Sequence, residues 1–100
     1  MAVLNYSHLA VQNLERLVDF LLDSDPAAAI DTVALIEEAA QVLVHHPLIG
    51  RSAEHGLREL VISRGRTGYV ALYRYREAED AILILALRHQ REAGFWQHDV

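Results

Sequence analysis

The chain has 100 residues, 52% of them hydrophobic, so we expect one domain with a single modest core and some apolar surface kept for a partner. It contains no cysteine, which excludes disulfides and thiolate metal sites. The opening segment MAVLNYSHLAVQ lacks the basic start of a signal peptide, and no apolar run approaches the ~20 residues that cross a bilayer. We therefore expect a soluble, cytoplasmic protein without membrane contact.

The formal net charge of −5 argues against a nucleic-acid partner, but the charge is unevenly placed. Residues 1–50 contain one Arg and seven acidic residues, whereas residues 51–100 contain eight Arg and seven acidic residues. The segment from Leu57 to Arg76 alone contains five Arg and one acid, Glu59. All basic residues are Arg, whose planar fork suits phosphate or carboxylate groups. The sequence thus predicts an acidic first half and a locally basic second half.

A short strand and a helix are predicted at the start of the chain. Residues 3–6 suit an edge strand, and Ser7 can cap the helix that follows by accepting a free first-turn amide. The helix is predicted over residues 8–23, because its apolar residues recur at the spacing of one helical face. These residues are Ala10, Leu14, Leu17, Val18, Leu21 and Leu22.

A second helix is predicted over residues 26–45. Asp25 can cap it, and Pro26 suits the first helical position, where an N–H has no intrahelical partner. The helix ends before Pro47, which cannot continue it. A short turn joins the two helices, so the first half of the chain is predicted to be a helical hairpin.

Three strands are predicted in the second half of the chain, over residues 57–63, 69–75 and 81–89. The first two are joined by an arginine-bearing loop and the last two by the acidic turn Glu77–Asp80. Short links favour antiparallel neighbours, so the three strands should form a meander. We therefore predict a single domain over residues 1–100, of class α+β and order β-α-α-β-β-β. A helical hairpin packs on a small antiparallel sheet, and residues 91–100 form a tail.

The last predicted strand is apolar at every position from Ala81 to Leu87, so both of its faces should be buried. The helical hairpin can cover only one face of a small sheet. A sister subunit, a bound peptide or the tail around Phe95 and Trp96 could cover the other face. A strongly curled sheet that wraps its own core explains the same pattern equally well.

Motifs for metal binding and nucleophilic catalysis are missing from the sequence. The six histidines form no HExxH pattern and the serines stand in no nucleophile motif, so we expect no metal and no cofactor. Arginines and tyrosines of the second half could bind phosphates and stack on bases. His89 beside these arginines would suit RNA cleavage as an acid or base. Packing alone also explains the pattern, since Tyr69, Tyr73 and Tyr75 share one strand face.

Five pieces of the sequence occur in an order that is typical of one family, although no single piece is diagnostic. They are LERLVDFL at residues 14–21, HPLIGR at 46–51, GLREL at 56–60, GYVALYRY at 68–75 and ILALRHQRE at 84–92. With the predicted order of helices and strands, they make the chain resemble the RelE/ParE toxin superfamily of type II toxin–antitoxin systems. The resemblance runs from Ser7 to about Phe95, and such sequences are often called plasmid stabilisation proteins.

The resemblance implies a partner protein, the cognate antitoxin. It would be a small co-encoded protein with a DNA-binding N-terminus, and its C-terminal segment would wrap this chain in a heteromeric complex. Part of that segment would lie as a helix in a groove, and part would add a strand to the sheet. We expect the antitoxin to contact the first helix and the middle strand of the meander at Leu14, Leu17, Leu21, Tyr69, Tyr73 and Tyr75.

Two activities occur in this superfamily, since RelE-like members cut mRNA in the ribosome and ParE-like members poison DNA gyrase. RelE-like toxins usually carry an Arg three residues before the tyrosine of the middle strand. Here that position is Val70, before Tyr73, which weakens the nuclease interpretation. The segment Ala86–Arg91 looks more like the ParE pattern, although some RelE-type nucleases have a functional His near the position of His89. We therefore favour growth inhibition through gyrase.

Each alternative assigns its own residues. A gyrase poison, which is not an enzyme, would face its target with Arg88, His89, Gln90, Arg91, Phe95 and Trp96. A ribosome-dependent endoribonuclease would use as catalytic residues His89, Arg88, Arg64 and Arg58. A third alternative is a non-toxic module that only binds its protein partner.

Overall fold

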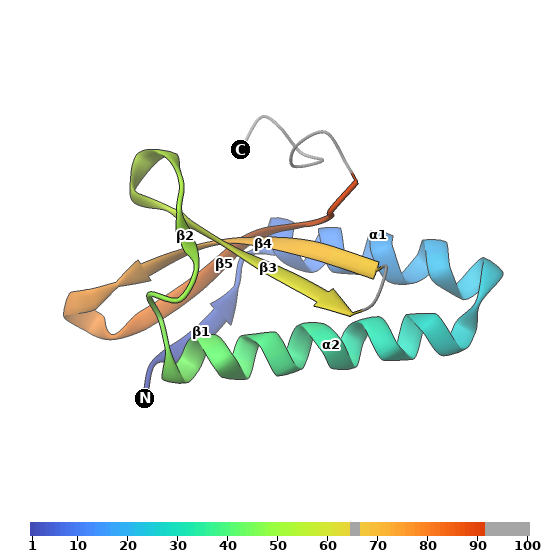
Figure 1. Cartoon of the computed structure of the whole chain (residues 1–100), viewed down its shortest axis with the longest axis horizontal. Coiled ribbons are helices and arrows are strands. Elements are labelled where there is room, and N and C mark those ends of the chain that lie inside the picture. Colours follow the sequence, from blue (N-terminus) through green and yellow to red (C-terminus); the bar gives the residue numbers. More distant parts are fainter. Residues whose placement is uncertain (65–66, 92–100) are drawn as a thin grey trace.

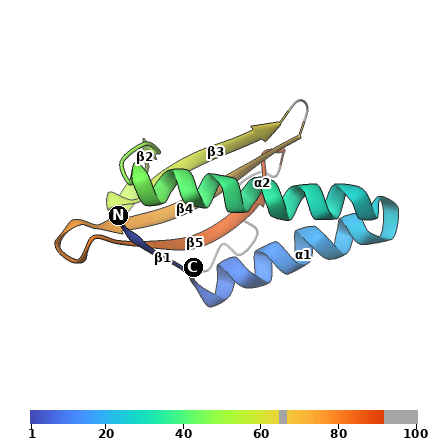
Figure 2. The same ribbon diagram turned by 90° about the horizontal axis from the view of Figure 1, so that it is seen from below.

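A five-stranded sheet with two helices on one face makes up the computed structural model (Figure 1 and Figure 2), which describes residues 1–64 and 67–91. The strand order is β1-β5-β4-β3-β2. The elements are β1 (Val3–Tyr6), α1 (His8–Ser24), α2 (Pro26–His45), β2 (Arg51–Ser52), β3 (Arg58–Arg64), β4 (Thr67–Arg76) and β5 (Ala81–His89), with 3-10 turns at Glu54–Gly56 and Glu77–Glu79. The predicted α+β class, with a helical hairpin on a mostly antiparallel sheet, is confirmed.

Both helices begin where the sequence places their caps. Ser7 Oγ accepts a hydrogen bond from the N–H of Ala10 at 3.0 Å. Asp25 Oδ1 accepts one from the N–H of Ala28 at 3.2 Å, and Pro26 is the first helical residue. Each bond satisfies an amide that the first turn of a helix leaves without an intrahelical partner. The two helices end within one residue of the predicted positions.

The strands β3, β4 and β5 form the predicted antiparallel meander, with bounds that differ from the prediction by at most two residues. The sequence does not predict β2, because two residues are too few to carry a periodicity. This strand pairs antiparallel with β3 and places Arg51 opposite Glu59. The acidic turn before β5 is a 3-10 turn that ends at Asp80, whose φ of 48° is in the left-handed region.

The first strand, β1, lies at the sheet edge next to β5 and confirms the predicted edge strand. The two strands are parallel, with Val3 opposite Ala81 and Tyr6 opposite Ile84. A parallel pair requires a long connection between its strands. Here the whole chain between residues 7 and 80 forms that connection, so the pair joins the two ends of the domain.

The core lies between the helices and the sheet. The helix α1 packs mainly on β5, while α2 runs beside α1 and contacts β3 (Figure 2). The largest fully buried side chains of the core include Tyr73, Ile36, Leu43, Ile82, Ile84 and Leu87. On the other face of β5, Leu83 is 36% exposed, and the expectation that a partner or the tail covers this face stays a prediction. None of the described helices is long and apolar enough to cross a membrane.

Gly50 lies against the ring and hydroxyl of Tyr73. A Cβ added there would lie 2.6 Å from Tyr73 Oη and 2.8 Å from the carbonyl oxygen of Glu59, closer than van der Waals contact allows. We predict that Gly50→Ala lowers the free energy of unfolding by about 1–3 kcal/mol, the usual cost of overpacking. Urea unfolding measures this difference, with the exposed Ser52→Ala as control. Equal stability of the two variants would contradict the prediction.

Candidate functional site

The strand β5 leads into the four residues 88–91, which the sequence predicts to face the target. His89 lies on the helix side of the sheet, where its ring meets the ring of Tyr69 edge-on with 5.4 Å between centroids. Arg88 pairs with Val70 and lies on the opposite side, because neighbouring residues of a strand alternate between faces. Both side chains are half-buried, whereas the two residues that follow are exposed.

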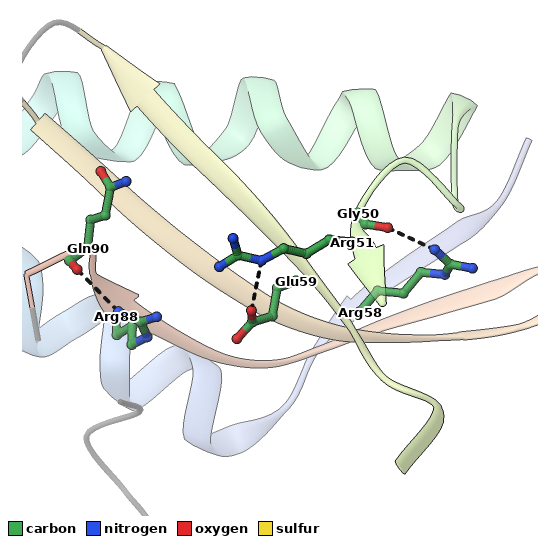
Figure 3. Close-up of polar contacts among 6 residues, drawn as sticks. All are labelled: Gly50, Arg51, Arg58, Glu59, Arg88 and Gln90. Carbon is green, nitrogen blue, oxygen red and sulfur yellow. Dashed lines mark hydrogen bonds and ion pairs between the residues drawn. The ribbon is translucent and has the colours of Figure 1, made fainter. Parts of the chain in front are cut away.

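Hydrogen bonds within this segment hold its backbone in one shape. Arg88 Nη1 donates to the carbonyl oxygens of His89 at 3.3 Å and Gln90 at 3.4 Å, the second of which is drawn in Figure 3. The N–H of Arg91 donates to His89 Nδ1 at 3.1 Å. In this conformation Nδ1 is an acceptor, so a neutral His89 carries its proton on Nε2. We call residues 88–91 the strand end.

Gly68 of β4 makes room for the strand end. Its carbonyl oxygen accepts a hydrogen bond from the N–H of Gln90 at 2.8 Å. The side chain of Gln90 occupies the space that a Cβ at residue 68 would need, so a larger residue there would displace it. Beyond this turn, Phe95 and Trp96 of the predicted target-facing set lie outside the described residues.

The structure does not bring the four predicted catalytic residues together. Arg58 Nη1 donates to the carbonyl oxygens of Leu48 at 3.3 Å and Gly50 at 2.8 Å. Figure 3 shows Arg58 turned toward Gly50, well apart from Arg88. Arg64 ends β3, and its side chain falls outside the described part of the chain. Arg58 therefore holds the loop before β2, and a catalytic use of the four residues stays a prediction.

Three of the six residues predicted to contact the antitoxin lie in the interior. They are Leu17, Tyr69 and Tyr73, which are 7%, 2% and 0% exposed. Tyr73 Oη donates to the carbonyl oxygen of Pro47 at 2.8 Å and accepts from the N–H of Gly50 at 2.9 Å. Burial raises the pKa of Tyr73, while the Gly50 N–H and the charge of Arg58 act in the opposite direction. In this conformation these three side chains pack the core and present almost no surface to a partner.

The other three predicted contacts, Leu14, Leu21 and Tyr75, are half-buried. Leu14 and Tyr75 pack on the core. The hydroxyl of Tyr75 donates to Asp80 Oδ1 at 2.8 Å, and this hydrogen bond raises the pKa of Tyr75. Contact between these three residues and an antitoxin stays a prediction.

An apolar groove that the sequence does not predict lies between α1 and α2. It has a volume of about 370 Å³ and is lined by Val18, Leu22, Ala29, Ile30, Val33, Ala34 and Glu37. Two large side chains in it are exposed, Leu22 at 48% and Ile30 at 71%. The sequence feature that could have indicated this groove is Ile30, an isoleucine outside the regular apolar spacing of α2. Sequence periodicity placed Val18 and Leu22 on the apolar side of the first helix but did not indicate that they line a groove with Ile30.

A second hollow, of about 660 Å³, lies between β1 and α2 and shares Ala34 and Glu37 with the groove. Its lining also includes Tyr6, Glu38 and Gln41. Burial and the nearby carboxylate of Glu37 raise the pKa of Tyr6. The two hollows are therefore neighbours along α2, with the carboxylates of Glu37 and Glu38 in their lining, and together we call them the hairpin groove.

The sequence as a whole matches one family of toxins. The family described as the ParE toxin of type II toxin–antitoxin system, parDE, matches residues 4–94. Toxin RelE3 of Caulobacter vibrioides is 37% identical over 83 residues, which cover 83% of this chain and 88% of that protein. Toxin RelE1 of the same organism is 37% identical over 65 residues, 65% of this chain and 70% of that protein.

Two solved toxin–antitoxin systems contain a similar fold. A chain of the chromosomal ParDE system from P. aeruginosa has a TM-score of 0.71 and 26% identity, covering 89% of this chain and 96% of that one. A chain of the RelBE2 complex from Mycobacterium tuberculosis has a TM-score of 0.62 over 89% of this chain and 98% of that one, and at 22% identity it supports the fold alone. The chain therefore belongs to the ParE toxin family of type II toxin–antitoxin systems, within the RelE/ParE superfamily.

Proposed function

We propose that this toxin inhibits growth by binding DNA gyrase and that a co-encoded antitoxin holds it inactive. The observation that carries the choice of gyrase is the position of the basic side chains. Arg58 is bound to the loop before β2, while Arg88 and His89 are engaged in hydrogen bonds within the strand end. RNA cleavage needs an acid–base group and cations around one phosphate. A gyrase-binding surface needs only a fixed shape and complementary charge.

The strand end has properties that suit such a binding surface. Its local hydrogen bonds fix the backbone before the target arrives, so less conformational freedom is lost on binding. Gln90 and Arg91 are exposed. The guanidinium of Arg91 can make charge-assisted hydrogen bonds to carboxylates of a protein target.

We assign the hairpin groove to the antitoxin. A helical segment of the antitoxin could place apolar side chains against Leu22, Ile30 and Val33, in the manner of a helix in a groove. Basic residues beside them would face Glu37 and Glu38. Such a cover explains why a large side chain like Ile30 is left 71% exposed on the isolated chain.

Purified toxin is predicted to stop negative supercoiling by gyrase. Arg91→Ala should weaken this inhibition about tenfold, because one charge-assisted contact of about 1.4 kcal/mol is lost. Arg74→Ala removes another exposed arginine, on β4, and should inhibit as well as the unmodified chain. Full gyrase activity at saturating toxin would disprove the target, and an equal loss in both variants would disprove the assigned surface.

A ribosome-dependent endoribonuclease is the second candidate, because both relatives in Caulobacter vibrioides are named as RelE toxins. It requires codon-specific cuts in mRNA in a translating extract, which His89→Ala would abolish. Our proposal predicts that mRNA stays intact in this assay. Toxin expression without any growth defect, while the antitoxin still binds, would instead identify a non-toxic binding module.

The assignment of the hairpin groove is tested with Ile30→Asp. This change should weaken antitoxin binding about 100-fold in calorimetry, because the complex would bury an unpaired carboxylate against apolar side chains. Val42→Asp makes the same kind of change on α2 at an exposed position outside the groove, and its binding should be normal. Ile30→Asp should stay toxic in cells without antitoxin, which shows that it folds. Normal antitoxin binding by this variant would refute the assignment.

A further inference from the structure

The strand β5 contains one residue more than β4 in the middle of their pairing. Tyr73 stands opposite Ile84, but Ala71 stands opposite Leu87. Two steps along β4 therefore correspond to three steps along β5. The extra residue, Leu85, forms a β-bulge.

The bulge decides on which face the residues of the strand end lie. Before the bulge, Ile84 points to the helix side, and regular alternation would place Arg88 on that side and His89 on the face away from the helices. The extra residue reverses this order. His89 therefore lies against Tyr69 on the helix side, and Arg88 lies on the face away from the helices.

The start of α1 holds the bulge in place. The strand β1 pairs with β5 only as far as Ile84. From there the N–H and Oγ of Ser7 donate to the carbonyl oxygens of Ile84 and Leu85, each at 2.8 Å. The N–H of Leu87 donates to Asn13 Oδ1 at 3.0 Å. On the edge of β5 that faces away from β4, the side chains of Ser7 and Asn13 therefore bind the backbone at the bulge in place of a neighbouring strand.

Asn13 is an unusual residue for its position. It is 1% exposed on the core side of α1, and its Nδ2 has no hydrogen-bond partner among the residues that the structure describes. A leucine of similar size would avoid burying that donor. The side-chain oxygen of Asn13 therefore explains why this residue is an asparagine, because it accepts the hydrogen bond from the N–H of Leu87. This bond allows the adjoining residues of β5 to change the face of the sheet on which they lie.

We infer that Asn13 is a positioning residue for the strand end. By holding the N–H of Leu87, it fixes the bulge and so places Arg88 on the face away from the helices and His89 against Tyr69. It need not contact any partner itself. The consequence for gyrase binding rests on the proposed function, whereas the positioning of the two side chains does not.

The experiment compares Asn13→Leu, which cannot accept the bond, with Asn13→Asp, which keeps an acceptor oxygen. Leu17→Ala is the control, since it removes buried side-chain volume from the same face of α1 and keeps Asn13 in place. In Asn13→Leu, the nuclear Overhauser contact between the rings of His89 and Tyr69 should disappear. The Leu87 amide should exchange about 100-fold faster as its bond is lost. Asn13→Asp and Leu17→Ala should keep the ring contact.

Gyrase inhibition and antitoxin binding are measured on the same variants. Asn13→Leu should inhibit gyrase at least about tenfold less well, while its antitoxin binding changes little. If the unmodified toxin leaves gyrase untouched, the proposed target fails, and the ring contact still decides the positioning role. An intact ring contact in Asn13→Leu would overturn the inference.

A measurement on the unmodified protein covers the case in which Asn13→Leu does not fold. A scalar coupling across the hydrogen bond should connect the amide nitrogen of Leu87 with the side-chain carbonyl carbon of Asn13. Its presence would support the inference, because it reports the bond directly. Its absence, with the Leu87 amide unprotected, would overturn it.

Discussion

The backbone of β5 is shared among three partners, and the rest of the structure depends on that sharing. One edge of β5 pairs with β4, while the other pairs first with β1 and then with side chains from the start of α1. Backbone groups buried without hydrogen bonds are costly, so each of these contacts stabilises the fold. The beginning and the end of the chain must therefore fold together, and the helical hairpin is fixed over the sheet.

That fixed arrangement separates two surfaces of opposite character. The hairpin groove combines apolar residues with Glu37 and Glu38, while the strand end presents arginine. We propose that the first selects a basic, apolar antitoxin segment and the second selects the cellular target. The uneven charge of the sequence, with an acidic first half and an Arg-rich second half, is consistent with two partners of different charge.

Local signals in the sequence account for most of the fold. Caps at Ser7 and Asp25, with helical and strand periodicities, predict each long element, because these features act within a few residues. The bulge at Leu85 and the roles of Arg58 and Asn13 depend on contacts between distant segments, which no local pattern records. Burial of Leu17, Tyr69 and Tyr73 in the core likewise depends on how the helices pack on the sheet, which the regular apolar spacing of one helix does not specify.

The central claim is that one side of this toxin binds its antitoxin and the strand end binds gyrase. Hydrogen exchange on the toxin, measured alone, with antitoxin and with gyrase, tests it most directly. We expect antitoxin to protect amides of α1 and α2 around the hairpin groove, and gyrase to protect those of residues 88–91. Protection by ribosomes but not by gyrase, or an antitoxin footprint that leaves the hairpin unchanged, would contradict the account.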